Sequence, residues 1–240
     1  MELSAVELLL AIAAVAAGSL VQGSIGFGLA VVAAPILYAI NPVLIPGPII
    51  VTALFIGSLT THRYISALRI QDIRYAIVGR IPGSVLGGLL LSLVSARSMS
   101  LLLGGSVLIA VAASLTPFKF QANPRSLFTA GVLSGVMGTA SSIGGPPMAL
   151  VMQNEQGDRI RANLSAFFVV SCIISLVVLW AGGMFGIQHL LYGLSMVPGV
   201  FIGNWLAGMV APRVNRTVMK RALLFLCSFS GVSAIWAALH

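Results

Sequence analysis

Two motifs rich in glycine and serine contain the residues of this chain whose types and spacing suit chemistry. The first is Gly23–Gly28, with the sequence Gly-Ser-Ile-Gly-Phe-Gly, and the second is Gly138–Pro147, with the sequence Gly-Thr-Ala-Ser-Ser-Ile-Gly-Gly-Pro-Pro. Glycine permits backbone conformations that other residues resist, so both motifs can present successive N–H groups. A helix that begins directly after such a motif adds free N–H donors and about half a positive charge, which suit an anion.

Neighbouring polar side chains extend this candidate site. A helix is expected to begin near Leu29 after the first motif, and Pro146 and Pro147 suit the first turn of a helix after the second. Serine hydroxyls, one glutamine and one threonine add hydrogen-bond donors. We therefore predict that two half-helices bind a small oxyanion without a buried cation, through Gln22, Gly23, Ser24, Gly26, Gly28, Thr139, Ser141, Ser142, Gly144 and Gly145. The alternative is that the glycines only allow close helix packing.

Composition indicates an integral membrane protein. Of the 240 residues, 58% are hydrophobic and 8% are charged, and no charged residue lies between Glu7 and Arg63, whereas soluble domains carry about 25% charged residues. The apolar runs do not alternate with polar residues as barrel strands do, so we predict an all-α polytopic fold. The net charge of +8 does not indicate a nucleic-acid partner, because the basic residues form short clusters between apolar runs.

The apolar runs divide the chain into helical segments. We predict ten of them, at 5–22, 29–40, 43–62, 73–95, 98–116, 126–140, 146–154, 163–182, 189–211 and 217–238. A full membrane span needs about 20 residues, and three segments are shorter. The pairs that flank the glycine motifs are therefore expected to form re-entrant or broken hairpins, which are tolerated at membrane depth where they line a cavity. Full spanning by these pairs is the alternative.

The basic residues predict the orientation. On alternating sides, one set of connections contains Arg63, Arg69, Arg74, Arg80, Lys119, Arg125, Arg159, Arg161, Arg213, Arg216, Lys220 and Arg221. The other set contains Arg97 alone. By the positive-inside rule the first set is cytoplasmic, so both termini face outward across the cytoplasmic (inner) membrane. Arg80 is expected to reach the cytoplasmic interface by snorkelling, with attraction of the substrate as the alternative role. Asn163 is expected to form interhelical hydrogen bonds.

The two halves of the chain resemble each other. Ser24–Gly26 matches Ser142–Gly144, and residues 81–97 align with residues 197–213 with six identities. We therefore predict a first membrane repeat at 1–116, a cytoplasmic linker at 117–125 and a second repeat at 126–240. Because each half holds about five segments, the second repeat should be inverted, with substrate bound at the repeat interface near the bilayer midplane.

At these residues the chain resembles the TauE/SafE family of membrane permeases, also called sulfite exporters. The resemblance rests on both glycine motifs, on Pro35, and on the repeated Pro-Gly-x-x-x-Gly at 82–87 and 198–203. It implies transport of small sulfur-containing anions, such as sulfite, sulfonates or thiosulfate, across the cytoplasmic membrane.

The predicted function is therefore that of a secondary transporter, namely an exporter, which moves a small anion through the lipid bilayer by alternating access. No cofactor or metal is expected; a proton or a sodium ion as coupling ion and assembly as a homodimer are both compatible with the sequence. Two alternatives are a passive channel for anions or small solutes and an intramembrane serine hydrolase. The hydrolase needs a base beside its serine, and His62, His189 and His240 are all expected near membrane surfaces.

Overall fold

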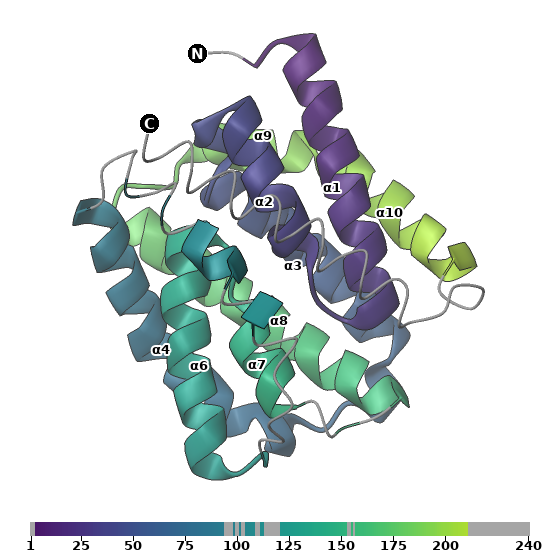
Figure 1. The fold of residues 1–240 in the computed structure, drawn as a ribbon, viewed down its shortest axis with the longest axis vertical. Coiled ribbons are helices and arrows are strands. Elements are labelled where there is room, and N and C mark those ends of the chain that lie inside the picture. The colour runs from purple at the N-terminus through teal and green to yellow at the C-terminus, as the bar shows by residue number, and fades with distance from the viewer. Residues whose placement is uncertain are drawn as a thin grey trace.

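The computed structural model describes residues 3–93, 98, 101, 104–108, 111–112, 121–152, 155 and 157–210. Over these residues the regular secondary structure is entirely helical, which confirms the predicted all-α class (Figure 1). The α-helices are α1 (Ala5–Ile25), α2 (Leu29–Ile40), α3 (Gly47–Arg63), α4 (Ile70–Leu93), α6 (Pro124–Ser141), α7 (Gly145–Val151), α8 (Gly157–Ala181), α9 (Ile187–Ser195) and α10 (Val197–Val210). Two short 3₁₀ turns, η1 (Pro42–Leu44) and η2 (Ile65–Ala67), flank α3. The predicted segment 217–238 and part of 98–116 lie outside the described residues.

Four stretches of the described chain are long and apolar enough to cross a membrane: Ala5–Ser24, Ile70–Leu93, Gly157–Ala181 and Ile187–Met209. The two helices that return from the glycine motifs are shorter, with 12 residues in α2 and 7 in α7. Since about 20 residues are needed to span, α2 and α7 do not cross alone. The depth of the two turns stays a prediction.

The predicted single segment at 189–211 is in fact two helices, because the chain bends at Met196 between α9 and α10. Pro198 has no N–H group, so the carbonyl four residues earlier receives no helical hydrogen bond from it. The backbone instead tightens, and the N–H of Gly199 bonds to the carbonyl of Met196 at 3.0 Å. Pro82, the residue aligned with Pro198, lies inside the continuous helix α4.

Glycine stripes bring two pairs of helices into close contact. On α4, Gly79, Gly83 and Gly87 face backbone atoms of α6, so that a Cβ at Gly87 would lie 2.6 Å from the carbonyl oxygen of Val136. The aligned glycines of α10 contact α1 in the same way: Gly199 faces Ile12, and Gly203 faces Ala16. Small residues allow such close approach of helices in membranes.

The helix packing is reciprocal between the two halves. The fourth segment of the first half, α4, packs on the first segment of the second half, α6. Conversely, α10 of the second half packs on α1 of the first, and Figure 1 shows both pairs side by side. Two related halves would produce this arrangement, and the inverted repeat stays a prediction.

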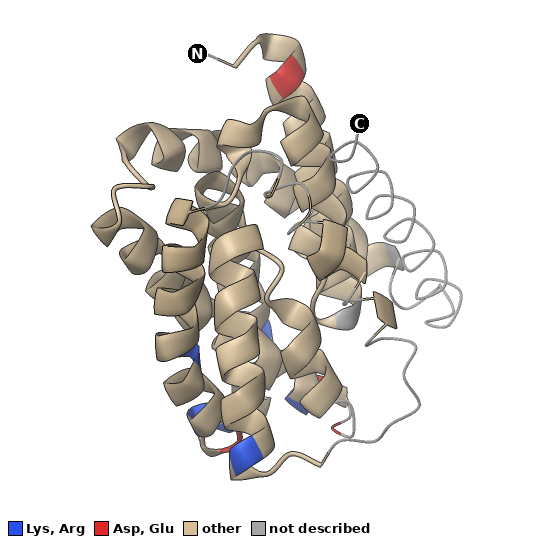
Figure 2. Ribbon diagram, turned by 60° about the vertical axis from the view of Figure 1, so that its left-hand side comes forward, with Lys and Arg blue, Asp and Glu red and all other residues tan. Residues whose placement is uncertain are grey.

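Charged residues gather at one end of the helix bundle. Figure 2 shows most of the described basic residues there and an acidic residue of α1 at the opposite end. At the basic end, buried Asn163 accepts a hydrogen bond from the Arg69 N–H at 2.9 Å and donates to Asp72 at 3.2 Å and to Glu155 at 3.1 Å. Asp72 also pairs with Arg159 at 2.7 Å. The interhelical role predicted for Asn163 is confirmed, since it joins the starts of α4 and α8.

Candidate functional site

Each glycine motif forms a turn between two helices. Helix α1 ends at Gly26 with φ 96°, and Gly28, with φ 123°, precedes α2. These left-handed conformations favour glycine because a Cβ would be strained there. The second turn has Ser142 at φ 65°. The predicted start of α2 at Leu29 and the predicted place of Pro146 in the first turn of α7 are both confirmed.

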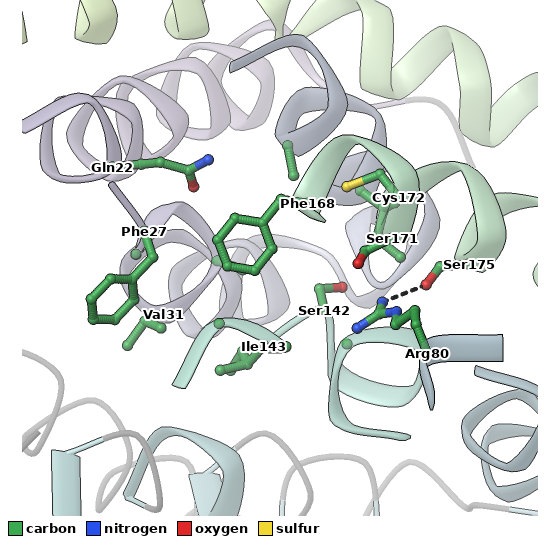
Figure 3. A pocket seen from close by; sticks show the side chains of 17 residues that line it. Gln22, Phe27, Val31, Arg80, Ser142, Ile143, Phe168, Ser171, Cys172 and Ser175 are labelled. Atoms are coloured by element: carbon green, nitrogen blue, oxygen red, sulfur yellow. Dashed lines mark hydrogen bonds between the residues drawn. The ribbon is translucent and has the colours of Figure 1, made fainter. Parts of the chain in front are cut away.

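The two turns meet at one cavity of about 60 Å³. The first motif contributes Phe27 and Gly28, and the second contributes Ser142 to Gly145. They touch each other, since a Cβ at Gly145 would lie 3.3 Å from the ring of Phe27. The full lining is Gln22, Phe27, Gly28, Ala30, Val31, Ile50, Ala53, Arg80, Gly138, Ser142, Ile143, Gly144, Gly145, Phe168, Ser171, Cys172 and Ser175 (Figure 3).

Half of the ten predicted site residues line this cavity, namely Gln22, Gly28, Ser142, Gly144 and Gly145. The carboxamide of Gln22 has a specific use, because its Oε1 accepts the N–H of Leu29 at 3.2 Å. This bond satisfies the first N–H of α2, which we had expected to face the ligand. The carboxamide nitrogen of Gln22 keeps its two hydrogens for another acceptor.

The other five predicted residues are not among the lining residues. Helices α1 and α6 continue through four of these positions as regular helix, and Gly26 caps the end of α1. Gly23 packs against Ala207 of α10, and Gly26 lies beside Arg161. The hydroxyls of Ser24 and Ser141 donate to carbonyls one turn earlier, Leu20 and Met137. Thr139 forms a 2.8 Å hydrogen bond with Ser175, so it positions a lining residue without lining the cavity itself.

Arg80 corrects the sequence-based interpretation most strongly. It was expected to snorkel to the interface, but it is only 3% exposed and lines the cavity. Helix α4 begins at Ile70, which places Arg80 about 15 Å along the helix axis. The cavity between the motifs therefore contains a buried cation, contrary to the prediction of a site without one.

The guanidinium of Arg80 is held by hydroxyl and carbonyl oxygens. Its Nη1 donates to the Ser134 carbonyl and, at 2.8 Å, to the Ser134 hydroxyl, while Nη2 donates to Ser175 at 2.8 Å. Its Nε is buried and has no hydrogen-bond partner. A buried donor without a partner costs roughly 1–3 kcal/mol, and more on a charged group, so this atom is suited to a ligand.

Two glycines of the second motif make room for this guanidinium. A Cβ at Gly138 would lie 2.6 Å from both Nη atoms, and a Cβ at Gly144 would lie 2.8 Å from Nη1. Real Cβ atoms do not approach so closely, so any larger residue at these positions would displace Arg80. The glycines here therefore serve the arginine as well as the turn.

Helix α8 supplies further lining residues that sequence reasoning missed. Ser171 and Ser175 are four residues apart and so share one face of the helix. The Ser171 hydroxyl is buried without a partner. Cys172 and Phe168 also line the cavity. Serines at this spacing in an apolar run, together with an arginine inside another span, are the signal that could have identified this face.

The first testable prediction concerns Gly138. We expect Gly138→Ala to weaken anion binding several-fold, because the new methyl group would displace the Arg80 guanidinium. Alanine otherwise favours a helix interior by about 0.5–1 kcal/mol, so thermal stability should not fall in parallel. The measurement is ligand-dependent thermal stabilisation of the purified protein.

The matched control is Gly208→Ala on α10, where a Cβ would meet no atom of the described residues within 4 Å. It should bind as the wild type does. Equal anion binding by the Gly138→Ala variant and the wild-type protein would contradict the assigned role of this glycine.

Comparison with known proteins then decides the family. A family model described as Sulfite exporter TauE/SafE matches residues 10–234. The chain belongs to the TauE/SafE family. The match includes both glycine motifs and every helix that contributes to the cavity, which confirms the resemblance drawn from the motifs. TauE/SafE proteins are transporters, and the apolar helices agree with a multi-pass membrane protein. No curated protein and no solved structure matches the chain.

Proposed function

We propose that this TauE/SafE protein exports a small oxyanion of oxidised sulfur, with sulfite as the leading candidate, and that the anion binds at Arg80 in the cavity between the two glycine motifs. The donors available there are the Nε of Arg80, the hydroxyl of Ser171 and the carboxamide nitrogen of Gln22. Five of the residues predicted for this role line the same cavity.

The observation that carries the proposal is a buried arginine without a counterion. The chain has five acidic residues, and none of those in the described part forms an ion pair with Arg80. A buried charge without a partner is costly, and membrane-embedded arginines mark substrate pathways for this reason. A bound anion would supply the missing charge and accept the hydrogen bond of Nε.

The cavity size favours a small substrate. Its volume is about 60 Å³, and one water needs roughly 10–15 Å³ by this kind of measure. The cavity therefore has room for a few water-sized groups, which matches an oxyanion with three or four oxygens. A large organic anion would need a wider opening than this conformation has.

The packing of the two halves supports alternating access. The cavity is lined by the turns of both halves, and α4 and α10 each pack on the first helix of the opposite half. In inverted-repeat transporters one bundle rocks against the other around such a site. We propose the same movement here, in which α4 slides on α6 and α10 slides on α1 along the glycine stripes.

The second prediction tests this function in proteoliposomes. Radiolabelled sulfite should enter vesicles faster when they are preloaded with unlabelled sulfite, because a carrier returns more quickly with substrate bound. Uptake should saturate and should produce no single-channel conductance. Liposomes without protein provide the background rate.

A conductance without stimulation by preloaded sulfite would instead identify a passive channel. Absence of any sulfite, sulfonate or thiosulfate flux above the background would refute the proposed substrate class.

A further inference from the structure

We infer that the cavity takes its substrate as a monoanion, so that sulfite is bound as hydrogen sulfite and its proton crosses the membrane on the substrate. This inference rests on the proposed function and specifies the ionic form of the ligand. The transported proton is then bound to the substrate and not to a side chain of the protein.

The charge of the cavity supports a monoanion. Among the described lining residues, Arg80 is the single formally charged side chain. The remaining walls are mostly apolar, and Figure 3 shows Arg80 and Ser175 at one end of the cavity and Phe27 and Val31 at the other. One guanidinium neutralises one negative charge. A dianion would keep its second charge away from water and without a partner, which is costly.

Within the part of the chain that the structure describes, the side chains that line the cavity include no carboxylate or imidazole that could take up a proton. Helices α6 and α8 pack on α4 around Arg80. The residues that these two helices and α3 contribute to the described lining include one titratable group, the thiol of Cys172. The nearest acidic residue along α4 is Asp72, which is paired with Arg159 and lies about 12 Å along the helix from Arg80. Glu155 joins Asp72 through Asn163 at the same end.

Sulfite can carry the proton itself. Hydrogen sulfite and sulfite interconvert near neutral pH by gain or loss of one proton, with no other change in composition. If hydrogen sulfite alone is accepted, each transported sulfur carries one proton and one negative charge. The proton is released in the compartment where the ion leaves the cavity and ionises.

The third prediction compares three ligands of similar size on the purified full-length protein. Methanesulfonate is always a monoanion, sulfate is a dianion, and sulfite changes between the two forms. Binding is measured by calorimetry at about pH 6 and about pH 8, the range in which histidine is the side chain that ordinarily titrates.

We expect methanesulfonate to bind equally at both pH values and sulfate to bind at least about tenfold more weakly, which corresponds to about 1.4 kcal/mol. Total sulfite should bind about tenfold more weakly at the higher pH, because the protonated fraction falls.

Three results would overturn the inference: sulfate binding as tightly as methanesulfonate, sulfite binding equally at both pH values, or methanesulfonate losing affinity at the higher pH. The last result would show that a group of the protein titrates. Failure of all three anions to bind at either pH would refute the proposed function itself, so the two failures are distinguishable.

Discussion

Arg80→Met is expected to remove anion binding while the protein stays folded. Truncating one partner of a buried hydrogen-bonded charge pair costs about 2–5 kcal/mol, so the dissociation constant should rise at least about 30-fold. Methionine nearly fills the space of arginine and is the residue at the aligned position, Met196, which is fully buried. The serines that hold Arg80 keep other partners, because Ser134 donates to the Gly144 carbonyl and Ser175 bonds to Thr139.

Thermal stability separates this result from simple unfolding. Replacing a buried charge by a well-packed apolar residue is often neutral or stabilising, so the melting temperature without ligand should not fall. Arg80→Lys is the conservative comparison, and it should bind weakly because lysine keeps the charge but lacks the planar fork and the Nε donor. Wild-type affinity in Arg80→Met would exclude this arginine from the binding site.

Gly83→Leu is expected to have the largest effect on stability. Gly83 sits on the contact between α4 and α6, where even a Cβ would overlap the carbonyl oxygen and Cα of Val132. Overpacking a close contact costs about 1–3 kcal/mol and sometimes more, and leucine adds three further carbons beyond Cβ. We expect loss of monodisperse protein in detergent, or a melting temperature lowered by many degrees.

Gly208→Leu provides the control, because it places the same side chain at a position of α10 where a Cβ meets none of the described residues. It should leave the melting temperature nearly unchanged. If Gly83→Leu and Gly208→Leu behaved alike, the close α4–α6 contact would not be a determinant of the fold.

Much of the architecture follows from local sequence. Gly26 and Gly28 predict a turn because few other residues adopt their left-handed conformations. Pro146 predicts the start of α7 because proline suits the first turn of a helix. The family could also be predicted, because its motifs are short segments that repeat along the chain.

The depth of Arg80 could not be predicted in the same way. The guanidinium of an arginine in the third turn of an apolar helix extends to the membrane interface if bulky neighbours leave it no space. It stays in the bundle interior if neighbouring glycines leave space and nearby serines accept its hydrogen bonds. Those neighbours are Gly138 and Ser134 on α6 and Ser175 on α8, all more than 50 positions away in the sequence. The break at Met196 could not be predicted from Pro198 alone, because a proline does not always break a helix. The aligned Pro82 lies inside the unbroken helix α4.

Arg80, the one formally charged side chain among the described lining residues, has an electrical consequence for the proposed transport cycle. With an anion bound, the site would be neutral and would cross the membrane field without work. When the site is empty it keeps one positive charge, which the field acts on with about 2.3 kcal/mol per 100 mV over the full thickness. A cytoplasm at negative potential would therefore draw the empty, positively charged site inward, while the loaded, neutral site would cross unaffected. Each cycle would then carry one negative charge outward, so the resting voltage would favour export.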